Sequence, residues 1–87
     1  MSNPSISYPL YRKYKNGKNY FRIVSASEFD EIQVLGSNYL LHHFTAKILP
    51  DHNLIYDMTF DFETSWSEIR EEEFLGALEK VGSKTDS

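Results

Sequence analysis

Residues 10–25 read LYRKYKNGKNYFRIVS, two runs rich in aromatic, basic and β-branched residues that are separated by Asn16-Gly17. This dipeptide between such runs is the strongest short-range signal for a β-hairpin, because a type I′ turn needs positive φ at both central residues. The two-residue loop also fixes which residues lie opposite one another. The resulting register pairs Lys15 with Lys18, Tyr14 with Asn19, and Arg12 with Phe21.

The two faces of this hairpin differ in chemistry. One face carries Leu10, Phe21 and Ile23, which can pack on a core. The other face consists of basic and aromatic side chains, which we take as the candidate binding residues: Tyr11, Lys13, Lys15, Lys18, Tyr20 and Arg22. Such a surface can hold phosphates while its rings stack on bases. The same pattern is also typical of a solvated sheet face whose lysines discourage edge pairing.

Charge is divided sharply along the chain. Residues 1–25 hold five basic side chains and no acidic ones, whereas residues 26–87 hold four basic and thirteen acidic ones, for a net charge of −4. Such asymmetry marks either an interaction surface or charges that are neutralised within the fold, including by the acidic C-terminal helix proposed below.

The segment 25–36 is predicted as a short helix. Ser25 and Glu28 fit a capping box, Phe29 and Ile32 recur at helical spacing, and Gly36 suits the residue after a helix. A strand over Glu28–Leu35 remains the alternative, because β-branched and aromatic residues suit a sheet.

Residues 39–62 are predicted as a second hairpin with a turn at Pro50–Asn53. The period of two along its second strand is the signal of a half-buried strand. Apolar residues alternate there with mostly polar ones: Leu54, Tyr56, Met58, Phe60 and Phe62.

Residues 65–81 give the clearest helix prediction. Ser65 and Glu68 form a capping box, with a later start near Arg70 as the alternative. The apolar stripe, extended by Trp66 and Ile69, has spacing i, i+3, i+4, i+7: Phe74, Ala77, Leu78 and Val81.

The predicted fold class is therefore α+β, with an antiparallel sheet from two β-hairpins, two helices on one face, and the order ββαββα. We expect residues 1–82 to form one domain and residues 83–87 to be a frayed tail. The bulky residues of the helix stripe and strands are expected to be buried together: Trp66, Phe74, Leu78, Phe60 and Phe44.

Several chemistries are excluded or disfavoured. The chain has no cysteine, which excludes disulfides and thiolate sites and favours the cytoplasm. No apolar run approaches membrane-spanning length, and residues 1–9 do not resemble a signal peptide.

His42 and His43 point to opposite faces of a strand, and His52 lies in the predicted turn, so we expect no metal or other cofactor. Carboxylates at Asp57, Asp61 and Glu63 are expected on an outward strand face, without enzymatic activity.

These patterns predict a non-catalytic binding module that contacts another protein or its own copy through the open sheet face. Exposed apolar residues are expected on that face: Tyr11, Tyr20, Tyr39, Leu41 and Ile55. The alternative is an anion or single-stranded nucleic-acid binder that uses the basic hairpin. It is not favoured, because thirteen acidic residues repel a polyanion.

Overall fold

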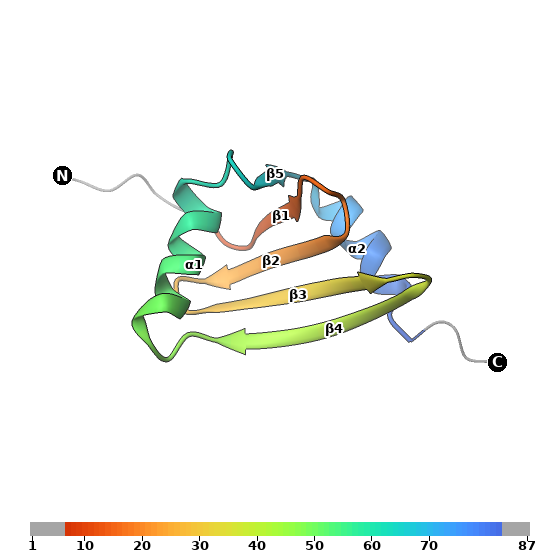
Figure 1. Cartoon of the computed structure of the whole chain (residues 1–87), viewed down its shortest axis with the longest axis horizontal. Helices are drawn as coiled ribbons and strands as arrows, with labels where there is room; N and C mark the ends of the chain where they lie inside the picture. Colours follow the sequence, from red (N-terminus) through yellow and green to blue (C-terminus); the bar gives the residue numbers. More distant parts are fainter. Residues whose placement is uncertain (1–6, 83–87) are drawn as a thin grey trace.

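The computed structural model describes residues 7–82, which form a five-stranded antiparallel sheet and two helices (Figure 1). The α+β class is confirmed, while the frayed tail expected at 83–87 lies outside the described residues. In chain order the elements are β1 (Leu10–Tyr14), β2 (Asn19–Ser25), β3 (Glu28–Leu35), β4 (Asn38–Thr45), α1 (Leu49–Phe60), β5 (Trp66–Glu68) and α2 (Glu71–Glu79).

The strands lie in the order β4-β3-β2-β1-β5. Four consecutive strands form a meander, and β5 pairs with the free side of β1. The predicted register of the first hairpin is confirmed by the pair Arg12 and Phe21. Its turn is wider than predicted, because Gly17 N–H donates to the carbonyl of Tyr14 at 2.8 Å and the loop spans residues 15–18. Gly17 has φ of 80°, so a glycine is still required there.

The helix predicted over 25–36 was wrong, and the strand alternative is right: Glu28–Leu35 is β3. Phe29 and Ile32 are both buried, which imitates helical spacing, but they lie on opposite faces of a strand that is covered on both sides. Gly36, with φ of 62°, lies in the turn between the paired residues Leu35 and Asn38 rather than after a helix.

The strand predicted over 54–62 was also wrong, because Leu49–Phe60 is the helix α1. Pro50 lies in its first turn, where the absent N–H costs nothing. The buried residues Ile55, Met58 and Thr59 have helical spacing. The alternation that suggested a strand is incidental, since Tyr56 and Phe60 are exposed. The residues predicted as the hairpin turn form the start of this helix.

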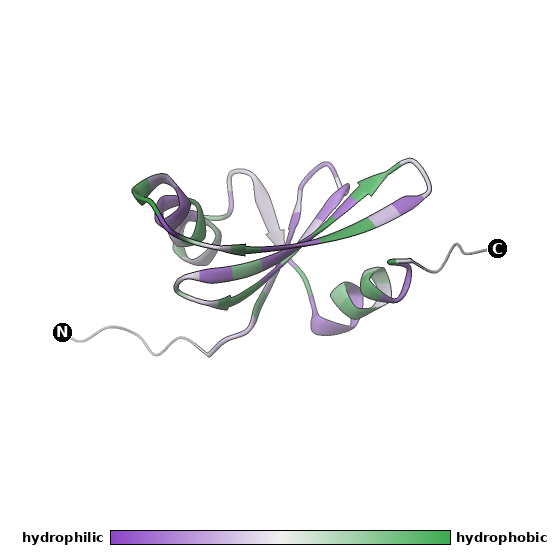
Figure 2. Cartoon of the chain, turned by 90° about the horizontal axis from the view of Figure 1, so that it is seen from below, coloured by the Kyte–Doolittle hydropathy of each residue, from purple (hydrophilic) through white to green (hydrophobic). Residues whose placement is uncertain are grey.

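The two helices cover opposite faces of the sheet, not one face as predicted (Figure 2). We call these the α1 face and the α2 face. The α1 face holds one core cluster, consisting of Phe21, Ile23, Phe29, Ile55, Met58 and Trp66. The α2 face holds the other, consisting of Ile32, Phe74 and Ala77, with Tyr11, Tyr20, Tyr39, Ile69, Leu78 and Val81 packed around it. Helix α1 lies at one end of the sheet and α2 at the other, so each leaves part of its own face open (Figure 1).

Because the core is divided between the two faces, the five residues expected to be buried together are not in one cluster. Trp66 and Phe74 are buried, but in different clusters, and Leu78 is only partly buried. Phe60 is 51% and Phe44 41% exposed. Trp66 belongs to β5, so helix α2 begins after it, at the later of the two predicted starts.

Arg12 is buried on the α1 face, at 4% exposure. Its Nε donates to the carbonyl of Met58 at 2.8 Å, in the last turn of α1, and one terminal nitrogen donates to the carbonyl of Tyr11 at 2.9 Å. The guanidinium carbon lies 3.9 Å from the centre of the Phe62 ring. Burial lowers the pKa of Arg12 from its ordinary value, although an arginine remains charged. The cation therefore meets the negative end of the helix dipole.

Among the residues at 7–82, no helix is both long and apolar enough to cross a membrane.

Truncating Phe74 to Ala is expected to lower the free energy of unfolding by about 3–5 kcal/mol, because its ring is fully buried. Phe60→Ala serves as the matched control and should cost under about 1 kcal/mol, since half of that ring is exposed. Urea denaturation followed by tryptophan fluorescence measures both values. Equal losses would contradict the assigned core.

Arg12→Lys is expected to destabilise the fold by about 2–4 kcal/mol, because an ammonium lacks the planar fork that reaches both carbonyls. Arg22→Lys, at a partly exposed ion pair, should cost about 1 kcal/mol or less. Thermal unfolding of the two variants compares them, and a larger loss for Arg22→Lys would refute the role given to Arg12.

Candidate functional site

Four of the six candidate binding residues of the first hairpin lie on the α2 face, as the register predicts: Tyr11, Lys13, Tyr20 and Arg22. Helix α2 meets them with its acidic first turn. The ammonium of Lys13 contacts the carboxylate of Glu73, and this hydrogen bond raises the pKa of Lys13. Lys13 also lies 5.8 Å from the ring centre of Tyr20. The charge of Lys13 is thus neutralised from within the chain.

Tyr11 and Arg22 pack on the buried ring of Phe74. The ring centres of Tyr11 and Phe74 are 5.5 Å apart, and the guanidinium carbon of Arg22 lies 4.8 Å from the Phe74 ring centre. Burial, and secondly the charge of Glu71, raises the pKa of Tyr11. These side chains act as packing residues for α2, whatever else they contact.

Lys15 and Lys18 lie apart from this packed region, in the exposed loop between β1 and β2. The structure therefore divides the six candidate residues: four contact α2 or its neighbours, and two are solvated at the hairpin tip.

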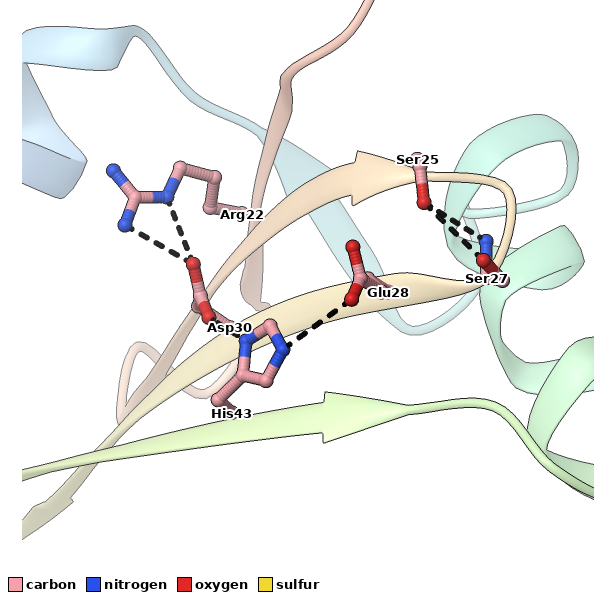
Figure 3. A network of polar contacts seen from close by, with 6 residues as sticks. All are labelled: Arg22, Ser25, Ser27, Glu28, Asp30 and His43. Atoms are coloured by element: carbon pink, nitrogen blue, oxygen red, sulfur yellow. Dashed lines mark hydrogen bonds and ion pairs between the residues drawn. The ribbon is translucent and has the colours of Figure 1, made fainter.

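A polar network crosses three strands on the α2 face, beginning at Arg22 beside α2 (Figure 3). Arg22 from β2 forms an ion pair with Asp30 from β3, with 3.0 Å between Nη2 and Oδ2. The other Asp30 oxygen lies 2.6 Å from Nδ1 of His43 on β4. Nε2 of His43 lies 3.7 Å from Oε2 of Glu28. Both oxygens of the buried carboxylate are therefore occupied, and the network ties β4 to the sheet.

The histidines do not converge. His42 and His43 lie opposite Glu31 and Asp30 on different faces, as expected for adjacent strand residues. His52 is an exposed residue of α1 rather than of a turn. Within residues 7–82, no three His, Asp or Glu side chains gather in a way that could hold a metal ion.

The three carboxylates expected on a strand face are placed differently. Asp57 lies in α1, Asp61 is the C-cap of that helix, and Glu63 follows it in the loop. They do not form a row on a sheet because the segment is helical.

Most of the residues expected to form an exposed apolar surface on the open sheet face are packed against a helix or buried. Tyr11, Tyr20 and Tyr39 pack around the α2 cluster, and Ile55 is 2% exposed in the α1 core. Leu41 alone of that set is substantially exposed, at 44%. Exposed apolar residues are spread over the described part of the chain and include Leu35, Tyr56 and Phe60. Five others lie on β4 and at the start of α1: Leu40, Leu41, Phe44, Ile48 and Leu49.

Strand β4 is an edge of the sheet, at its lower margin in Figure 1. Ala46 N–H donates to the carbonyl of Ser27, and Val34 N–H to that of Lys18. These bonds fix the alternation of the ladders, in which even-numbered residues of β4 bond to β3. Its odd-numbered residues therefore direct their N–H and C=O groups away from the sheet: Tyr39, Leu41, His43 and Thr45.

We call these outward backbone groups, with the side chains of Leu40, Leu41 and Phe44, the β4 edge. Its sequence, NYLLHHFT, contains no Lys, Arg, Asp, Glu or Pro. Edge strands are usually protected by such residues or by being short. The opposite edge is short, since β5 has three residues against eight in β4. The β4 edge is thus the unprotected edge of the described sheet.

An apolar hollow of about 220 Å³ lies between the sheet and α1, beside the end of β4. Phe29, Phe44 and Leu54 are among its lining residues. Its volume is below the roughly 300–1,000 Å³ of most small-molecule sites.

Comparisons of the chain with models of protein families, with curated proteins and with solved structures give no significant match.

The carboxylate of Asp30, through its hydrogen bond, raises the pKa of His43 above the ordinary value of 6.5. A raised pKa in the folded state means that this contribution to stability is fully present below about pH 6.5 and is lost as pH rises through the folded pKa. NMR titration of the His43 ring should show the raised pKa, and Asp30→Asn should bring it back towards 6.5. The stability of His43→Gln, relative to the unmodified chain, should fall least at high pH; a pH-independent difference would contradict the pairing.

Proposed function

We propose that this chain is a non-catalytic binding module that associates with another polypeptide through the β4 edge. The carrying observation is an eight-residue edge strand without Lys, Arg, Asp, Glu or Pro, whose outward backbone groups lie beside exposed Leu40, Leu41 and Phe44. Strand addition suits such an edge, because main-chain hydrogen bonds supply affinity and alternate side chains supply specificity.

Two further features support a binding role over catalysis. The most buried carboxylate of the polar network, Asp30, is neutralised by Arg22 and His43 rather than left to act on a substrate. The buried cation Arg12 is held by carbonyls of the fold. The absence of cysteine is in keeping with action in the cytoplasm.

Binding of single-stranded nucleic acid has less support. Lys13 and Arg22 already contact Glu73 and Asp30, and releasing them for phosphates would break both ion pairs. Lys15 and Lys18 are the exposed candidates, and two lysines give a weak electrostatic contribution.

Selection from a library of displayed random peptides on the immobilised protein tests the proposal. Enriched peptides should bind in extended form, and Leu41→Pro should abolish their binding. This change removes an outward N–H at an edge position, where proline is tolerated, and keeps the ladder bonds to β3.

Leu41→Thr is the matched control, because it also removes the leucine side chain but keeps the N–H. It should retain most of the binding. Peptides that bind Leu41→Pro as well as the unmodified protein would contradict an edge-binding function.

A further inference from the structure

The β4 strand is nearly symmetric in character about His42. Two positions to either side lie Leu40 and Phe44, both 41% exposed and both on the α1 face. The four residues with outward backbone groups are placed one and three positions to either side of His42. The edge therefore has the same arrangement when it is read in either direction.

Such an edge is complementary to a second copy of itself in antiparallel orientation. With a two-fold axis at His42, Leu41 lies opposite His43 of the second copy, and Tyr39 lies opposite Thr45. In this register every outward N–H and C=O group of the four residues finds a partner. Shifting the register by two residues in either direction leaves some of them unpaired.

The side chains fit the same register. Leu40 lies opposite Phe44 of the second copy on the α1 face, at the roughly 4.5–5.5 Å Cβ separation of directly opposed residues. Residues 38–45 carry no formal charge besides the two histidines, so the pairing sets no carboxylate or lysine against its like. Ile48 and Leu49, which are 60% and 71% exposed, lie three and four residues after the end of β4, at the start of α1.

We infer that the polypeptide bound at the β4 edge is a second copy of this chain, and that the two copies form a symmetric dimer with one continuous sheet. The inference rests on the proposed function and names its partner. Pairing through one eight-residue strand is a small contact, and contacts of this size are typical of weak, transient complexes, so we expect a dimer that exchanges rapidly.

Sedimentation velocity across the micromolar to low-millimolar range tests the association. The unmodified chain should shift from monomer to dimer with rising concentration. Leu41→Pro should weaken dimerisation by at least about tenfold, because two outward N–H groups are lost per dimer. Leu41→Thr should dimerise within a few-fold of the unmodified chain, and equal loss in both variants would overturn the strand pairing.

Cysteine cross-linking tests the register, because the chain has no cysteine of its own. His42→Cys places two thiols directly opposite each other at a non-hydrogen-bonded pair, where Cα atoms about 4.5 Å apart permit a disulfide. Under mild oxidation it should form the covalent dimer faster than Leu40→Cys. Lys18→Cys, in the hairpin loop, measures random collision. Faster cross-linking by Leu41→Cys or His43→Cys would overturn the axis at His42.

The outcomes separate this inference from the proposed function. A chain that stays monomeric at all concentrations, with His42→Cys no faster than Lys18→Cys, overturns the dimer. If peptides that depend on Leu41 N–H are nevertheless selected, the edge binds foreign strands and the proposed function stands without self-association.

Discussion

The hydrogen bond from the buried guanidinium of Arg12 to the carbonyl of Met58 is the interaction on which the arrangement of this fold depends. A buried cation is costly unless its donors are satisfied, and the carbonyl of Met58 satisfies one of them. Because Met58 lies at the C-terminal end of α1, that end is held against β1. The start of helix α1 follows β4, which forms the opposite edge of the sheet. Helix α1 must therefore cross the α1 face from β4 to β1, and the chain then continues into β5 beside β1.

Internal ion pairs account for part of the charge division along the chain. Two of the five basic residues of the first hairpin pair with carboxylates from later segments, Lys13 with Glu73 and Arg22 with Asp30. These contacts fasten α2 and β3 to the hairpin. The sequence suggested that the basic and aromatic face of the first hairpin could bind a polyanion. In the structure, most of this face packs against helix α2. The proposed binding surface lies instead in backbone groups and apolar side chains of β4.

The sequence predicts features that depend on local chemistry. Asn16-Gly17 gives the register of the first hairpin, and the stripe of Phe74 and Ala77 gives the buried side of α2. Prediction of secondary structure from the sequence fails where both sides of an element are covered. In β3, Phe29 and Ile32 belong to two different cores, so their spacing reads as helical. The α1 segment fails for the opposite reason: exposed Tyr56 and Phe60 complete an alternation with no structural meaning. The β4 edge could not be predicted, because edge position depends on the whole strand order.

The two edges of the sheet differ in a way that limits how copies can assemble. An unprotected edge usually invites open-ended association, which leads to fibres when both edges can pair. Here β5 has only three residues against eight in β4, so it offers little for another strand to extend. Pairing of β4 with β4 consumes the one long edge of each copy and leaves the short edges outside. The proposed contact is therefore self-limiting: the symmetry that makes β4 complementary to itself also closes the assembly at two chains.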